Sequence, residues 1–140
     1  MSSSDLKGML IRHERVMLKP YLDSKGKITI GVGRNLDDMG ITADEAMHLL
    51  ENDIARVRLE IGRSLPWFKD LDDVRQDAVI DMVFNLGLTR FMSFKALISA
   101  AQKKDWDRVA SEMLNSVWAS QVKGRAVELA GMMRTGTYSL

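Results

Sequence analysis

Two carboxylates and one hydroxyl follow one another at short spacing near the start of the chain. Glu14 lies near the end of a helical pattern, Asp23 opens a polar turn after eight further residues, and Thr29 follows after five more on a β-branched stretch. A carboxylic acid can protonate a leaving oxygen, while a carboxylate and a hydroxyl can position an attacking water. The trio therefore predicts hydrolysis of a glycosidic bond, with Glu14 as the general acid and with Asp23 and Thr29 holding the water.

Each of these residues also has an ordinary structural interpretation. Glu14 is a polar residue at a helix end, Asp23 is a residue type that favours turns, and Thr29 has high β propensity. The spacing, combined with the sequence TIGVG at 29–33, resembles the catalytic motif of the phage-type lysozymes, and this resemblance favours the catalytic interpretation for all three. Whether Asp23 acts as a full general base or mainly as an electrostatic stabiliser is left open by the residue types.

The surrounding pattern predicts the elements that hold this trio. A first helix reaches about His13, a small β ribbon spans 19–34, and a capping box from Thr42 to Glu45 opens a long amphipathic helix to about Ile61. Shorter helices are expected afterwards, and the first of them is apolar on nearly every face and therefore central. Their predicted ranges are 72–86, 93–101 with Ser93 as the cap, 105–114 with Asp105 as the cap, 117–121 and 123–134.

Composition excludes several classes of function. A chain of 140 residues with 46% hydrophobic residues can form one domain with a real core. Lys and Arg number 20 against 19 Asp and Glu, which disfavours a protein that coats nucleic acid. Cysteine is absent, and His13 and His48 form no metal-ligand pattern, so neither metal nor cofactor is expected. No signal peptide and no stable membrane insertion are expected either.

Several motifs occur in a fixed order over almost the whole chain. They are the Glu14–Asp23–Thr29 spacing with Tyr21, Gly26 and 29–33, then DMVFNLG at 81–87, KDW at 104–106, SVW at 116–118 and MRTGT at 133–137. In these motifs the chain resembles the phage-type lysozymes, and within them the T-even bacteriophage type of glycoside hydrolase family 24. The resemblance implies an α+β, mostly helical, lysozyme-like fold within a single domain, residues 1–140. A small β-ribbon N-terminal lobe (about 14–60) would be joined by a long connecting helix to an all-helical C-terminal lobe (about 1–13 with 61–140).

The resemblance also implies a function and further site residues. It implies a monomeric endolysin that hydrolyses the β-1,4 bond between N-acetylmuramic acid and N-acetylglucosamine in peptidoglycan, with inversion, and so lyses the host cell as a bacteriolytic, antimicrobial enzyme. It would be made in the host cytoplasm and act in the periplasm, with a holin supplying the exit. Arg125 matches an arginine that faces the catalytic Glu in this family, and Phe84, Asn85 and Gly31 match positions that bind substrate or support the cleft.

Three departures from the family pattern concern substrate contacts more than the reaction. The region between Gly33 and Thr42 is short, Asn85 stands where the T-even type has Gln, and Arg34 stands where it has His. We expect Arg34 to pair with an acidic partner, with Asp53 as the candidate.

Two alternative functions share the fold. A lytic transglycosylase needs no positioned water, so the presence of both Asp23 and Thr29 argues against it. A non-catalytic peptidoglycan-binding or phage tail-associated module would not need Glu14, which is present.

Overall fold

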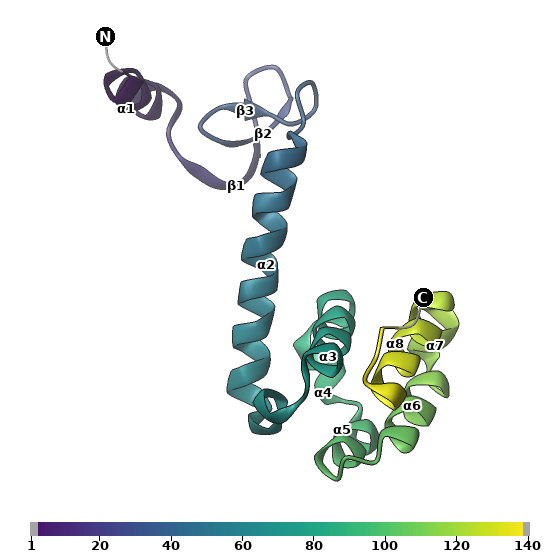
Figure 1. Ribbon diagram of the computed structural model, residues 1–140. Helices are drawn as coiled ribbons and strands as arrows, with labels where there is room; N and C mark the ends of the chain where they lie inside the picture. The colour runs from purple at the N-terminus through teal and green to yellow at the C-terminus, as the bar shows by residue number, and fades with distance from the viewer. Residues whose placement is uncertain (1–2, 139–140) are drawn as a thin grey trace. The chain divides into compact units, whose positions relative to one another are not determined.

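The computed structural model of the chain describes residues 3–138 (Figure 1). The fold is α+β and mostly helical, with one small antiparallel sheet, as the sequence predicted. The chain divides into two compact units, Met1–Leu49 and Leu50–Leu140, and the division falls within the long helix α2 (Ala43–Ser64). The predicted membership of residues 1–13 in the helical lobe stays a prediction.

The first unit carries helix α1 (Ser3–Glu14) and a three-stranded sheet. Strands β1 (Met17–Leu22), β2 (Ile28–Gly31) and β3 (Arg34–Asn35) lie in the order β1-β2-β3, and both pairs are antiparallel. Thr29 sits in the middle strand, opposite Tyr21 on one side and Asn35 on the other. The predicted ribbon is confirmed, and it places Thr29 at the centre of the sheet.

Helix α2 begins at the predicted capping box. The Thr42 hydroxyl accepts the Glu45 backbone N–H at 3.1 Å, and Glu45 Oε1 accepts the Thr42 N–H at 2.8 Å. The helix continues through Gly62 to Ser64, three residues beyond the predicted end at Ile61. Ile61 and Leu65 are buried in the core, so packing outweighs the low helix propensity of glycine in this last turn.

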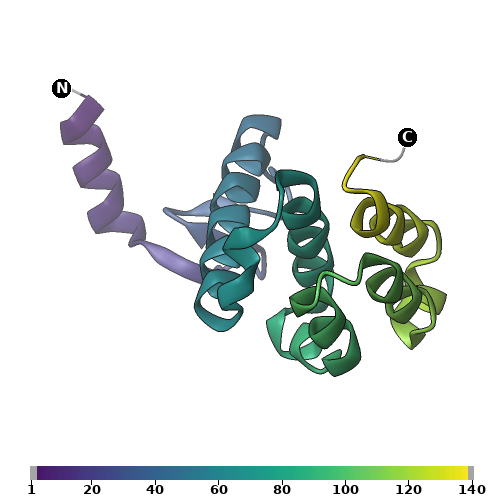
Figure 2. The same cartoon turned by 60° about the horizontal axis from the view of Figure 1, so that its bottom comes forward.

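The second unit consists of the C-terminal part of α2 and a series of shorter helices (Figures 1 and 2). Buried residues from these elements form one hydrophobic core. Helices α6 and α8 pack along each other, and α3 lies against α8. The elements are the 3₁₀ helix η1 (Pro66–Asp70), α3 (Asp73–Leu86), α4 (Leu88–Met92), α5 (Lys95–Gln102), α6 (Trp106–Leu114), α7 (Val117–Val122) and α8 (Gly124–Thr135).

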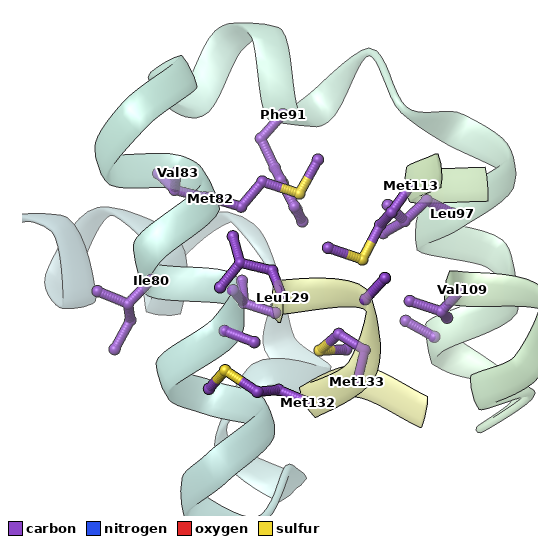
Figure 3. Close-up of a cluster of buried hydrophobic side chains, with 14 of the residues drawn as sticks. Ile80, Met82, Val83, Phe91, Leu97, Val109, Met113, Leu129, Met132 and Met133 are labelled. Carbon is purple, nitrogen blue, oxygen red and sulfur yellow. The ribbon is translucent and has the colours of Figure 1, made fainter. Parts of the chain in front are cut away.

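Methionine and aliphatic side chains fill this core (Figure 3). Met82, Met113, Met132 and Met133 are all buried, where a flexible, unbranched side chain can fill irregular gaps. Helix α3 contributes buried residues at six positions between Ala78 and Leu86, which confirms its central place.

Of the two side-chain caps predicted for these helices, the one at Asp105 is confirmed and the one at Ser93 is wrong. Asp72 caps α3, Asp105 caps α6 and Ser116 caps α7, each through a side chain that accepts a backbone N–H. The prediction that Ser93 caps the next helix is wrong, because its hydroxyl donates to the carbonyl of Arg90 in the last turn of α4. Helix α5 begins two residues later, after Phe94, without a side-chain cap.

No helix within residues 3–138 is both long enough and apolar enough to cross a lipid bilayer.

Candidate active site

Helix α1 ends at Glu14, and its carboxylate lies against a glycine. A methyl group at the Cβ position of Gly33 would lie 2.9 Å from Glu14 Oε2 and 3.1 Å from Cδ. Gly33 also has a φ of +69°, which side-chain-bearing residues rarely adopt. The backbone conformation at Gly33 therefore favours glycine, and its bare Cα leaves room for the Glu14 carboxylate in this position.

Asp23 is oriented by backbone donors in the turn that follows β1. Its Oδ1 accepts the N–H groups of Lys25 at 2.8 Å and Lys27 at 2.9 Å. These bonds, above all the one from Lys27, lower the pKa of Asp23 below its ordinary value. The carboxylate is thus held ionised, and its second oxygen has no protein hydrogen-bond partner among residues 3–138.

Thr29 is 3% exposed, and its hydroxyl proton is already engaged. The Thr29 hydroxyl donates to the carbonyl oxygen of Lys27 at 2.9 Å. With that proton committed, the hydroxyl oxygen can only accept from a further partner. The backbone of Lys27 therefore orients both residues, since its N–H bonds Asp23 and its C=O bonds Thr29. Sequence reasoning missed Lys27 because a main-chain role leaves no signature in residue type.

Gly31 ends β2 and, like Gly33, has a φ of +69°. A Cβ there would meet no atom within 4 Å, so its glycine is required by the turn and not by a neighbour. Gly31 lines an open pocket of about 650 Å³ in the first unit, together with Arg34, Glu45, His48 and apolar residues.

Arg34 pairs with Glu45, and the prediction of Asp53 as its partner is wrong. Its two terminal nitrogens donate to the two Glu45 carboxylate oxygens, each at 2.8 Å, and one of them also donates to the Gly40 carbonyl at 3.0 Å. Asp53 instead pairs with Arg56 at 3.4 Å. Glu45 lies in the first turn of α2, whereas Asp53 is about 12 Å further along the helix axis. The Arg34 bond lowers the pKa of Glu45 to about 2.

Arg125 and Phe84 line an open pocket of about 440 Å³ in the second unit. The Nε of Arg125 donates to Asp81 Oδ1 at 2.7 Å, and a terminal nitrogen donates to the Asp81 carbonyl at 3.4 Å. Phe84 is 43% exposed although it lies on the most buried helix. The pairing of Arg125 with Glu14 stays a prediction.

Asn85 is oriented by a buried tryptophan. The indole N–H of Trp118 donates to Asn85 Oδ1 at 2.8 Å. Trp118 is 2% exposed and lies in the core of the second unit. Because the Asn85 oxygen is occupied, its amide nitrogen is the group left to donate to a ligand.

Acidic and imidazole side chains do not gather into a cation site. Within the described range, 3–138, no three His, Cys, Asp or Glu side chains are grouped so that they could hold a metal ion. The chemistry available in the first unit is therefore that of carboxylates, a hydroxyl and backbone amides.

Comparisons with known proteins identify the family of the chain. The family described as phage lysozyme matches residues 11–135, which include Glu14, Asp23, Thr29 and the motifs of the second unit. The chain belongs to the phage lysozyme family. It is 31% identical to a probable T4-type lysozyme 1 of Dictyostelium discoideum, with 96% of each chain covered.

Two phage proteins are similar at lower identity. An endolysin of Acyrthosiphon pisum secondary endosymbiont phage 1 is 28% identical over 91% of this chain and 88% of its own. The pre-baseplate central spike protein Gp5 of Enterobacteria phage T4 is 28% identical over 91% of this chain, but over only 27% of its own length. Membership of the phage lysozyme family supports a glycosidase-type enzyme that acts on peptidoglycan.

Proposed function

We propose that this protein is an endolysin that hydrolyses the β-1,4 bond between N-acetylmuramic acid and N-acetylglucosamine in peptidoglycan, by a single displacement with inversion. The observation that carries the proposal is the Lys27 backbone, which bonds both Asp23 and Thr29 and leaves each with a free acceptor site. In this role the protein needs neither metal nor cofactor, acts as a monomer and lyses the host cell. It is made in the host cytoplasm and reaches the periplasm through a holin.

The water is held by two acceptors. One of its protons is donated to the free oxygen of Asp23 and the other to the Thr29 hydroxyl oxygen, which leaves a lone pair of the water to attack the anomeric carbon. Hydrogen bonds from Lys25 and Lys27 keep Asp23 ionised, so it stabilises the oxocarbenium charge and takes up the proton that the water loses.

Glu14 supplies the proton for the leaving oxygen. As the attack proceeds, the glycosidic C–O bond breaks and its electron pair takes the Glu14 proton. Glu14 thus loses one proton while Asp23 gains one from the water. Exchange with solvent restores both groups. The bare Cα of Gly33 lets the Glu14 carboxylate approach the backbone closely, which fixes the acid at the end of α1.

Candidate substrate contacts come from Arg125, Phe84, Asn85 and Gly31. The free amide of Asn85 is suited to donate to a sugar hydroxyl or an acetamido carbonyl. The 43%-exposed ring of Phe84 offers an apolar face for a sugar ring. Arg125 adds positive charge to the pocket that it lines together with Phe84, and it is itself held by Asp81.

The experiment is a turbidity assay on outer-membrane-permeabilised Gram-negative cells, combined with NMR of the first soluble product. Glu14→Gln keeps the shape of Glu14 without a transferable proton, so we expect clearing to fall about 10²–10⁴-fold in a folded variant. The wild type should release the α anomer first. Clearing by Glu14→Gln at the wild-type rate would refute Glu14 as the acid, an anhydromuramyl end would indicate a lytic transglycosylase, and wall binding without clearing would indicate a non-catalytic module.

A further inference from the structure

Strand β3 is short, and its two ends are held differently. It consists of Arg34 and Asn35, which pair with Ile30 and Thr29 of β2. The loop after β3 is joined to β2 by the Leu36 N–H, which donates to the Ile28 carbonyl at 2.7 Å, and by Asp37 Oδ2, which accepts the Ile28 N–H at 2.7 Å. These bonds hold the side of β3 that follows Asn35, so on the side next to Gly33 the contacts of Arg34 add to the few ladder hydrogen bonds of a two-residue strand.

Arg34 ties β3 to the start of helix α2. We call its contacts with Glu45 and the Gly40 carbonyl the Arg34 clamp. Both Arg34–Glu45 distances are 2.8 Å, which is the parallel two-bond geometry that arginine forms with a carboxylate. Glu45 is fixed in turn by the capping box, because its Oε1 also accepts the Thr42 N–H. The clamp therefore joins a two-residue strand to the first turn of a 22-residue helix.

Gly33, the neighbour of Arg34 in the sequence, lies against the carboxylate of the proposed acid, Glu14. Gly33 directly precedes β3, and the Glu14 carboxylate lies so close to its Cα that a methyl group would come within 2.9 Å of Oε2. A shift of β3 moves Gly33 and so changes the surface on which the carboxylate rests. The position of Glu14 is thereby linked to the Arg34 clamp through one peptide bond.

We propose that the Arg34 clamp is a positioning device for catalysis, and that Arg34 and Glu45 act on the reaction by holding Gly33 beneath the Glu14 carboxylate. This inference rests on the proposed function, in which Glu14 is the acid. Neither Arg34 nor Glu45 touches the reacting atoms, so both are positioning residues.

Electrostatic attraction between Arg34 and Glu45 does not by itself explain an effect of the Arg34 clamp on catalysis. The side chains of Arg34 and Glu45 are 37% and 41% exposed, and ion pairs at such exposure contribute little to stability. Their two-bond geometry restricts orientation in a way that a single ion pair does not. Rates depend steeply on such placement, since a 1 Å error in a reacting group costs about 10²-fold. The Arg34 clamp can therefore raise kcat even though it contributes little to the free energy of unfolding.

The test compares Arg34→Gln and Glu45→Gln with a matched control, Arg56→Ala. Arg56 also pairs with two carboxylates, Asp53 and Glu60, but it lies on α2 away from β3. Two readouts are taken well below the melting temperature of every variant. One is kcat and KM on soluble, uncross-linked peptidoglycan strands, and the other is the ¹³C chemical shift of the Glu14 carboxyl carbon across a pH titration.

We expect both clamp variants to lose roughly 3- to 10-fold in kcat, as a displacement of a few tenths of an ångström predicts, with KM nearly unchanged. The Glu14 carboxyl signal should shift in both and stay in place in Arg56→Ala. Arg34→Lys, which keeps the charge but not the two-bond geometry, should fall between the wild type and Arg34→Gln.

The two proposals fail in different ways. If the wild type does not cleave peptidoglycan but the Glu14 signal shifts in the clamp variants, the proposed function is wrong and the positioning link stands. If the wild type cleaves, Glu14→Gln does not, and the clamp variants lose melting temperature without any change in kcat or in the Glu14 signal, the Arg34 clamp is purely structural and the inference is overturned.

Discussion

A comparison of Gly33→Ala with Gly31→Ala isolates the contact between Glu14 and the backbone beneath it. Both glycines have a φ of +69°, so alanine is strained equally at the two positions. Only at Gly33 does the added methyl group meet another residue, and that residue is Glu14. The pair of variants therefore separates the effect of backbone strain from the effect of displacing the carboxylate.

The expected magnitudes follow from the geometry. A left-handed φ costs an L-residue about 1–2 kcal/mol, which corresponds to a loss of about 3–7 °C in melting temperature for a chain of this size. At Gly33 the methyl group would lie 2.9 Å from Glu14 Oε2, whereas ordinary contact begins at 3.4 Å. The carboxylate must therefore move by about 0.5 Å. If a 1 Å error costs about 10²-fold in rate, this shift predicts roughly a 10-fold lower kcat.

The assay measures melting by circular dichroism and kcat on soluble peptidoglycan strands, at a temperature where both variants are folded. Gly31→Ala carries the same strain without the contact to Glu14. Because kcat is measured at saturating substrate, a lost substrate contact at Gly31 changes KM, and the ratio of the two kcat values reports the displacement of Glu14. We expect similar melting temperatures and a roughly 10-fold ratio in kcat. Equal kcat values at equal stability would refute the reasoning, because the Gly33 contact would then have no effect on the acid.

Three further predictions test other parts of the site. Asp23→Asn should fold normally, because the amide oxygen still accepts the Lys27 N–H, but should lose most activity; near wild-type clearing would make Asp23 a turn residue only. The pKa of Glu45 is lowered from 4.5 to about 2, so its paired carboxylate stabilises the fold above pH 4.5 and this contribution is lost as the pH falls towards 2. Acid titration of the melting temperature should therefore show Glu45→Gln less stable than the wild type at pH 6 and converging with it near pH 2, and a constant difference would contradict the pairing. Trp118→Phe removes the donor to Asn85 and should raise KM more than it lowers kcat, whereas an unchanged KM would show that Asn85 binds no substrate.

Much of the fold could be predicted because local signals and packing agree. The capping box from Thr42 to Glu45 and the acidic caps at Asp72 and Asp105 mark helix starts in residue types alone, and all three form. Helix α4 was missed because it is five residues long, too short for an apolar period to show. Ser93 was misassigned for the same reason, since a residue between two short helices can serve the end of one as well as the start of the other.

In the proposed site, only the polar side chains could be predicted. Residue type and spacing predict Glu14, Asp23 and Thr29 as site residues, but they do not predict the groups that contact these side chains. Gly33 acts through an absent side chain and Lys27 through its peptide bond, and neither property is visible in a sequence unless the backbone path is known. Partners such as Asp81 for Arg125 depend on which helices meet, which periodicity does not decide.

The charge states of the Arg34 clamp explain why an arginine suits position 34. A histidine there would change charge between about pH 5 and 8, and a contact that depended on that charge would weaken across the range. Arg34 stays cationic, and its bond to Glu45 raises its own pKa further while lowering that of its partner to about 2. Both partners are thus charged at every pH above about 4. The Arg34 clamp then holds Gly33 equally well throughout that range, so the pH dependence of turnover between pH 5 and 8 should reflect the reacting groups and not the loosening of β3.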